Sequence, residues 1–170
     1  MGEIKIEDNL VQNSESENDC LHRPLFNVNI KLFINNERYK KTILDICDYM
    51  KLVITQEYEN YQKLSGLSGA NIGIPFNIIA LVKKDEVVCM INPSIVKMSK
   101  QTRMIKSNCG SLNLKDKISV SRREWVDVSY YDIFGRHNQE RYTIANGGAT
   151  IQHEIDHNRG ILIIDRSKHL

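Results

Sequence analysis

The stretch His153-Glu154-Ile155-Asp156-His157, near the C-terminus, constrains the fold of this 170-residue chain more than any other. Two histidines four positions apart lie on one face of a helix, one turn from each other. Their imidazoles can therefore bind a single divalent metal ion, and the glutamate between them can act on a water molecule beside that ion. The alternative interpretation is a solvent-exposed helix with two incidental histidines. A third ligand elsewhere in the chain would favour the metal site.

Cys109 is a candidate third ligand, in the small polar stretch 107–111. The other cysteines, Cys20, Cys47 and Cys89, show no paired spacing, so we expect reduced thiols rather than disulfides. Taken alone, a cysteine such as Cys109 is more often a buried loop thiol than a metal ligand. One thiolate and two imidazoles would give three protein ligands and one open position, which is typical of a catalytic metal site.

The composition is that of an ordinary globular domain. The formal net charge is +2 with 26% charged residues, and no basic stripe indicates a nucleic-acid-binding surface. No apolar run has the length of a transmembrane helix, and the N-terminus lacks the apolar core of a secretory signal. The length predicts one domain over residues 1–170, with a polar, acidic lead-in over about residues 1–22. We therefore expect a cytoplasmic protein.

Helical periodicity appears in two places. Apolar residues at spacings of three and four predict a long helix over residues 37–63. A second helix is expected to begin within residues 144–148, to carry both histidines, and to end at Asn158 before Gly160.

Strand patterns fill much of the remaining chain. Alternation over residues 26–32 predicts a strand or an extended arm, and small residues predict a loop over 65–69. Further strands are predicted at residues 78–82, 87–91, 94–98, 118–120, 125–132, 139–143 and 161–164. These elements predict an α+β fold in which mixed or antiparallel sheets pack around a central C-terminal metal-binding helix.

Three stretches taken together resemble the signature motifs of the peptide deformylases, which read approximately GxGLAAxQ, EGCLS and HExDH. The corresponding stretches are residues 66–73, 107–111 and 153–157. The third match is complete, whereas the first has Asn71 in place of glutamine and Ser68-Gly69 in place of two alanines. The second keeps the cysteine and the final serine of the family pattern. The resemblance extends from about residue 43 to residue 166.

This resemblance implies a metal-dependent hydrolase that removes the formyl group from the N-formylmethionine of newly made polypeptides and releases formate. The implied site residues are Glu154, Asn71 and Gly110 for catalysis, Cys109, His153 and His157 for the metal, and Ser65, Gly66 and Asn108 for the substrate. In this scheme Glu154 moves a proton, while the Asn71 amide and the Gly110 N–H stabilise an oxyanion.

The resemblance also implies the cofactor and the partners. The family uses one ferrous ion (Fe2+), and Zn2+, Ni2+ or Co2+ can occupy the same site, whereas cysteine and histidine ligands by themselves are typical of zinc. The expected partners are N-formylmethionyl nascent peptides, with a transient ribosome contact left open. We expect neither a membrane nor a nucleic acid as a direct partner.

Two other functions fit parts of the sequence. Asn71 and the altered stretch 107–111 would fit a catalytically impaired deformylase-like protein that binds a metal or nascent peptides, although the complete third motif argues against it. A zincin-type metallopeptidase uses the same histidine–glutamate helix but takes its third ligand after it. The candidates there are Asp165 and His169.

Overall fold

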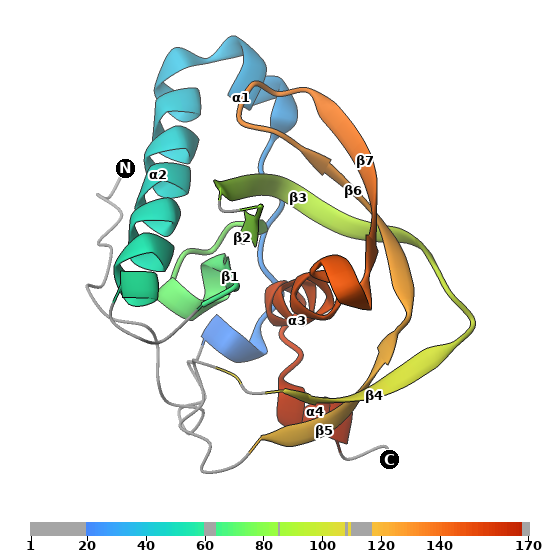
Figure 1. The fold of residues 1–170 in the computed structure, drawn as a ribbon. Helices are drawn as coiled ribbons and strands as arrows, with labels where there is room; N and C mark the ends of the chain where they lie inside the picture. The colour runs from blue at the N-terminus through green and yellow to red at the C-terminus, as the bar shows by residue number, and fades with distance from the viewer. Residues whose placement is uncertain (1–19, 60–63, 85, 108, 110–116, 168–170) are drawn as a thin grey trace.

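The computed structural model describes residues 20–59, 64–84, 86–107, 109 and 117–167 (Figure 1). Its helical elements are η1 (Cys20–His22), α1 (Ile30–Asn35), α2 (Glu37–Glu59), η2 (Gly69–Ile72), η3 (Ile144–Asn146), α3 (Gly148–Asn158) and α4 (Ile163–Ser167). Its strands are β1 (Gly66–Ser68), β2 (Ile78–Lys83), β3 (Glu86–Met98), β4 (Thr102–Ser107), β5 (Ile118–Arg123), β6 (Trp125–Tyr131) and β7 (His137–Thr143).

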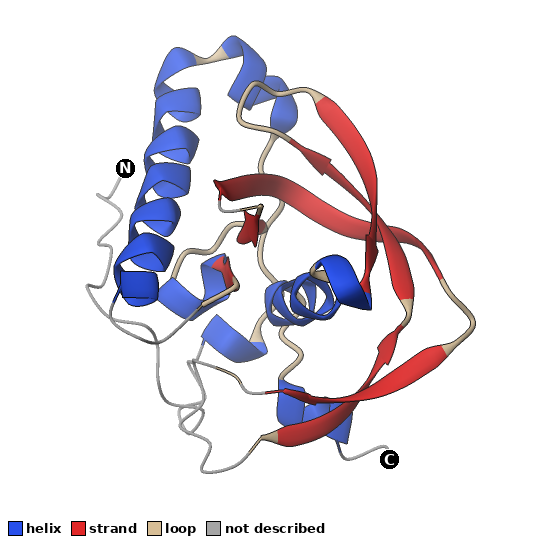
Figure 2. Ribbon diagram, viewed as in Figure 1, coloured by secondary structure: helices blue, strands red, loops and turns tan. Residues whose placement is uncertain are grey.

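The strands form two sheets around α3. Five strands pair in the order β1-β2-β3-β6-β7, and β4 pairs with β5 in a second sheet. All these pairings are antiparallel. Figure 2 shows α3 in the middle of the molecule, and α3 contacts β1, β2, β5, β6 and β7. The expectation of an α+β fold around a central C-terminal helix is confirmed.

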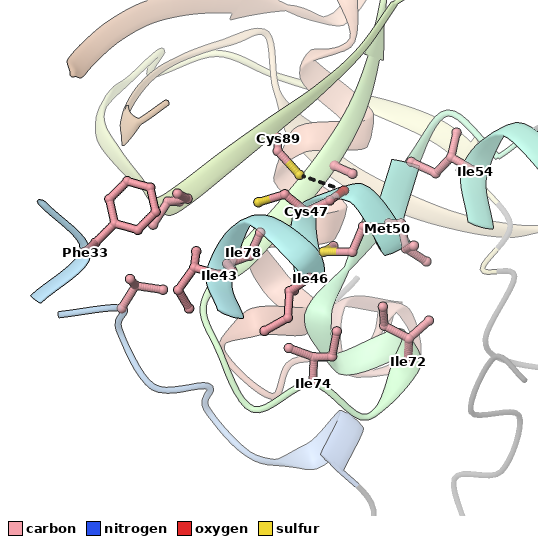
Figure 3. Packing of buried hydrophobic residues seen from close by; sticks show 14 residues of the cluster. Phe33, Ile43, Ile46, Cys47, Met50, Ile54, Ile72, Ile74, Ile78 and Cys89 are labelled. Atoms are coloured by element: carbon pink, nitrogen blue, oxygen red, sulfur yellow. Dashed lines mark hydrogen bonds between the residues drawn. The ribbon is translucent and has the colours of Figure 1, made fainter. Parts of the chain in front are cut away.

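Strand β2 is buried on both faces, which explains its uninterrupted apolar sequence. Ile78 and Ala80 join the hydrophobic cluster under α2 (Figure 3), whereas Ile79 and Leu81 join a second cluster that includes Ile151 of α3. The labelled members of the first cluster are Phe33, Ile43, Ile46, Cys47, Met50, Ile54, Ile72, Ile74, Ile78 and Cys89. The sheet is therefore held between α2 on one side and α3 on the other.

Strand β3 continues through the Asn-Pro pair that was expected to end it. Asn92 adopts a positive φ of 54°, and the pairing with β6 shifts register between Ile91 and Ser94. The Asn92 side chain accepts a hydrogen bond from Val28 N–H (2.8 Å) and donates one to Val28 O (2.9 Å). An asparagine tolerates this backbone conformation better than most residues, so the chain passes through a bulge rather than a stop.

The C-terminal end of α3 is fixed to the N-terminal part of the described chain. Asn158 is the last helical residue, and Gly160 follows with φ 73°, as the sequence predicted. Leu25 N–H donates to Asn158 O (2.8 Å), and Asn158 Nδ2 donates to Asn77 Oδ1 (2.8 Å). These bonds hold the helix directly after the second histidine of the motif.

The expected strand or extended arm over residues 26–32 is wrong from Ile30 onward. The Asn29 side chain accepts the Leu32 N–H at 3.1 Å, and this N-cap starts helix α1 at Ile30. Phe26 forms an isolated parallel bridge with Phe76. Amphipathic alternation over seven residues did not outweigh the local capping signal.

Other boundaries also differ. The expected strand over 161–164 is wrong, because the Asp165 carboxylate accepts the Leu162 N–H (2.9 Å) and α4 begins at Ile163. The expected loop over 65–69 contains strand β1, which gains its order by pairing with β2. The long predicted helix is confirmed as α2 up to Glu59, and its expected end at 60–63 lies outside the described residues. None of the helices in the described part of the chain combines the length and apolar character that crossing a bilayer requires.

Candidate metal centre

Cys109, His153 and His157 come together at one face of α3. The Sγ of Cys109 lies 3.3 Å from His157 Nε2, and the two histidine Nε2 atoms are 3.1 Å apart. All three potential ligand atoms lie within 4.8 Å of one another. The two imidazole rings meet nearly edge to face, with an interplanar angle of 80°. The spacing of four residues on a helix and a cysteine 44 positions upstream of His153 thus converge on one point.

These separations fit a metal ion. Tetrahedral ligation with bonds of about 2.3 Å to sulfur and about 2.0–2.1 Å to nitrogen separates two nitrogens by about 3.3 Å, and a sulfur from a nitrogen by about 3.6 Å. The observed distances of 3.1 Å and 3.3 Å are close to these values. One thiolate and two imidazoles therefore suit a divalent ion with an open fourth position.

Burial keeps both imidazoles in the form that binds metals. Desolvation lowers the pKa of His153 well below its usual value, and it lowers the pKa of His157 to about 4. The nearby Arg122 guanidinium acts in the same direction on both rings. Neutral imidazoles present a lone pair to a cation, so the site does not need to lose a proton from either ring at neutral pH.

Asp156 is not one of the clustered residues and anchors the helix. Its carboxylate forms ion pairs with Arg122, which is buried, and with Arg166. Removing one partner of a buried pair leaves an uncompensated charge, so this arrangement strongly favours one position of α3. Arg122 was not predicted, because it stands beside Arg123 after the expected strand over 118–120 and no local pattern marks one of the two arginines as buried.

Gln152 provides a second connection between α3 and β5. Its Oε1 accepts the Arg123 N–H at 2.9 Å, and its Nε2 donates to Arg123 O at 3.0 Å. The side chain therefore pairs with the strand backbone as another strand would. Together with the Asp156 ion pairs, it fixes the rotation of the helix that presents His153 and His157.

Glu154 lies next to the cluster and is 5% exposed. Burial raises the pKa of its carboxyl to about 8, while the charge of Arg122 and a backbone hydrogen bond from Ser68 oppose this rise. Gly66 packs directly on it, because a Cβ at that position would lie 2.9 Å from Glu154 Cγ. The carboxyl is thus buried and has a raised pKa, which is typical of a proton-transferring group.

Asn71 occupies η2, which contacts α3. Its Oδ1 accepts the Ser68 N–H at 2.7 Å, and the side chain is buried. Because a backbone N–H can only donate, this bond identifies the oxygen and turns Nδ2 to the opposite side of the amide. The Oδ1 atom of Asn71 is therefore fixed by the Ser68 N–H, and the Nδ2 donor points away from that N–H.

Ser65 and Gly66 lie where β1 meets α3. The Ser65 hydroxyl is 3.1 Å from Thr150 Oγ1, and Thr150 precedes Glu154 by one helical turn. The other two residues expected in the site, Asn108 and Gly110, lie outside the described residues. Ser68 was noted in the sequence only as a substitution in the first motif, and its contact with Glu154 depends on the packing of β1 against α3.

Asp165, one of the two candidates for the third ligand of a zincin, does not join the two histidines. Asp165 Oδ2 accepts the Leu162 N–H at the start of α4, and Asp165 is absent from the cluster that the described residues form. His169 lies outside the described residues. The ligand set therefore favours the upstream cysteine.

A family model described as polypeptide deformylase matches residues 12–170. A peptide deformylase of Chloroflexus aurantiacus is 34% identical over 121 residues, which are 62% of this chain and 64% of that protein. One of Chloroflexus aggregans is 30% identical over 139 residues, or 71% of this chain and 73% of that protein.

The fold has solved counterparts. An actinonin-bound class I type b peptide deformylase from Acinetobacter baumannii superposes with a TM-score of 0.76 at 21% identity, covering 94% of this chain and 97% of that one. This likeness concerns the fold. The alignment with the Chloroflexus aurantiacus protein spans slightly less than two thirds of that relative's length.

Proposed function

The chain belongs to the polypeptide deformylase family, and from this premise we propose that it hydrolyses the formyl group from the N-formylmethionine of newly made polypeptides. The products are formate and a free N-terminal amine. The observation that carries the proposal is the convergence of Cys109, His153 and His157 at α3, the helix that also carries the buried Glu154 between the two histidines. Because nascent chains are the substrate, a cytoplasmic location and a transient ribosome contact belong to the same proposal.

Cys109, His153 and His157 would hold one divalent ion. By family resemblance this is Fe2+, and the donor set also suits Zn2+, Ni2+ or Co2+. When bound, the ion polarises the formyl oxygen and makes a coordinated water molecule more acidic. The ion pairs of Asp156 and the backbone contacts of Gln152 keep the two histidines in place during turnover.

Glu154 acts as the general base and then as the general acid. It accepts a proton from the attacking water and delivers it to the nitrogen of the leaving amine, so that water and the formamide yield formate and the amine. Its burial supports both steps, since a carboxyl with a raised pKa takes up and holds a proton more readily than an exposed one.

Asn71 stabilises the negative charge that develops on the formyl oxygen. Its Oδ1 is held by Ser68 N–H, so Nδ2 is the end of the amide that can donate to the oxyanion. Gly110 N–H would be the second donor. The path of the peptide would be lined by Ser65, Gly66 and Asn108. Ser65 lies at the junction of β1 and α3, where its hydroxyl is 3.1 Å from Thr150 Oγ1.

A formate-release assay tests this function. Protein purified without oxygen and loaded separately with Fe2+, Ni2+, Co2+ or Zn2+ is incubated with an N-formylmethionyl peptide and, as a comparison, with the same peptide unformylated. We expect formate and new amine in equal amounts from the first peptide and no internal cleavage of either. Bound metal without formate release would favour the impaired deformylase-like protein, and internal cleavage would favour a peptidase.

Replacing Cys109 with alanine should abolish tight metal binding while leaving the fold intact. The thiolate is one of three protein ligands, and a two-histidine site binds divalent ions far more weakly. Metal per chain, measured by mass spectrometry after dialysis, should be near one for the wild type and near zero for C109A. Cys89→Ala is a matched control, because Cys89 is equally buried but lies under α2, against Cys47. Unchanged metal content in C109A would remove Cys109 from the site.

Replacing Gly66 with alanine should slow turnover by displacing Glu154. The added Cβ would lie 2.6 Å from Thr150 Cγ2 and 2.9 Å from Glu154 Cγ, so the carboxyl must move. A misplacement of about 1 Å near the reacting atoms can cost about a hundredfold in kcat. The overpacking itself costs about 1–3 kcal/mol of stability.

Gly135→Ala is the control for this variant. Gly135 has φ 78° in the turn between β6 and β7, so alanine is strained there without touching the metal centre. We expect a loss of stability but an unchanged kcat in G135A. If G66A retains full kcat with bound metal, the position of Glu154 is not critical for catalysis.

A further inference from the structure

Ser68 Oγ and Glu154 Oε2 are two of the five buried side-chain atoms for which the described residues offer no hydrogen-bond partner within normal geometry. The Ser68 oxygen also faces the Asn71 N–H in a capping box at the start of η2, so the hydroxyl proton is the part of this group that lacks an acceptor. Ser68 has 0% exposure and Glu154 has 5%. Unpaired buried polar groups destabilise a protein, and most of them are paired with protein atoms or ordered water in native structures. A hydroxyl that can donate and a carboxylate oxygen that can accept are therefore both left incomplete in one region.

The backbone brings these two groups together. Ser68 N–H donates to Asn71 Oδ1 at 2.7 Å, and the Ser68 backbone also hydrogen-bonds to the Glu154 carboxyl. β1, which ends at Ser68, packs against α3, as Figure 1 shows. Gly66 allows this close approach, because any larger residue there would meet Glu154. Ser68 thus lies between the proposed oxyanion donor and the proposed general base.

A single water molecule can satisfy both groups. It would accept the Ser68 hydroxyl proton and donate one of its own hydrogens to Glu154 Oε2. Buried waters occur where at least two polar partners can each bond to them, and Ser68 and Glu154 each offer one such atom. We propose that a water molecule bound between Ser68 Oγ and Glu154 Oε2 makes Ser68 a positioning residue for the Glu154 carboxyl, an inference that rests on the proposed hydrolytic function.

The resembling motif has alanine at this position, so the turn from β1 into η2 forms without a hydroxyl. In this chain the Ser68 oxygen faces the Asn71 N–H at the start of η2, and the hydroxyl proton remains to be donated to a group on the Glu154 side. Through the water and the Ser68 N–H, Glu154 is held from two directions, which restricts its side chain to one rotamer.

Ser68→Ala in the full-length, metal-loaded protein tests the inference. We expect kcat for formate release to fall about tenfold, with KM within about twofold of the wild type. Metal content and the thermal unfolding midpoint should not change. In a Glu154→Ala background, Ser68→Ala should cause no further fall in the residual rate, because its effect passes through Glu154. A high-resolution crystal structure of the wild type should contain a water within hydrogen-bond distance of both Ser68 Oγ and Glu154 Oε2.

Ser99→Ala is the matched control. Ser99 is also buried, but its hydroxyl donates to Gln101 O (2.6 Å) between β3 and β4, so kcat should be unchanged. The inference would be overturned by full kcat in S68A, by an equal loss of rate with and without Glu154, or by a parallel loss of metal or stability. A crystal structure without the water would do the same. That readout does not depend on turnover, so wild-type protein that releases no formate would contradict the proposed function alone.

Discussion

Replacing Glu154 with alanine or glutamine is expected to lower kcat for formate release by about a thousandfold or more, the upper part of the range for a general acid–base group. Glu154 is not among the three clustered ligands, so both variants should still bind one metal ion per chain. Glutamine is the more informative change. Burial raises the pKa of the Glu154 carboxyl to about 8, so the pocket favours a neutral group and should accept the amide with little loss of stability.

The measurement combines steady-state formate release with metal analysis on the same samples. Glu124→Gln serves as the control, because Glu124 forms an ion pair with Arg103 away from the metal cluster and should not affect kcat. A Glu154→Gln variant that binds metal and turns over at the wild-type rate would show that another group moves the proton. Loss of metal together with activity would instead indicate a structural role for the carboxyl.

The metal ligands could be predicted because their geometry is local or their motif is specific. His153 and His157 are four residues apart, so any helix over this stretch places them on one face. Cys109 could be selected among four cysteines only through the resemblance of its neighbours. Helix α2 and the strands of the β2–β3 hairpin followed from apolar periodicity, since both pack against the large core clusters.

The parts that sequence reasoning missed depend on contacts between distant residues. Strand β4 is largely exposed, so it lacks the apolar alternation by which strands are recognised, and it forms by pairing with β5. The burial of Arg122 against Asp156 brings together residues 34 positions apart. Ser68 and Glu154 meet because β1 packs on α3, and no local pattern in either segment indicates that contact.

Asn71 provides the second large expected effect. Asn71→Ala should lower kcat/KM for formate release by about a hundredfold or more, which is the usual loss when one oxyanion donor is removed. Asn71→Asp should lose a similar amount. Aspartate can still accept the Ser68 N–H, which Asn71 Oδ1 accepts at 2.7 Å, but it has no N–H to offer an oxyanion. The aspartate variant therefore separates the donor role of Nδ2 from the structural role of Oδ1.

Asn71→Gln tests whether the shorter side chain is adapted to its surroundings. Asn71 is buried, and its Oδ1 is held by a residue only three positions away, which suits an asparagine side chain. Glutamine is longer by one methylene and cannot keep that hydrogen bond without moving the donor end, so we expect turnover to fall. A nearly neutral Asn71→Ala in an otherwise active enzyme would exclude Asn71 as the oxyanion donor. An inactive wild type that gains formate release on Asn71→Gln would instead identify the chain as a catalytically impaired member of its family, with the shortened amide as the cause.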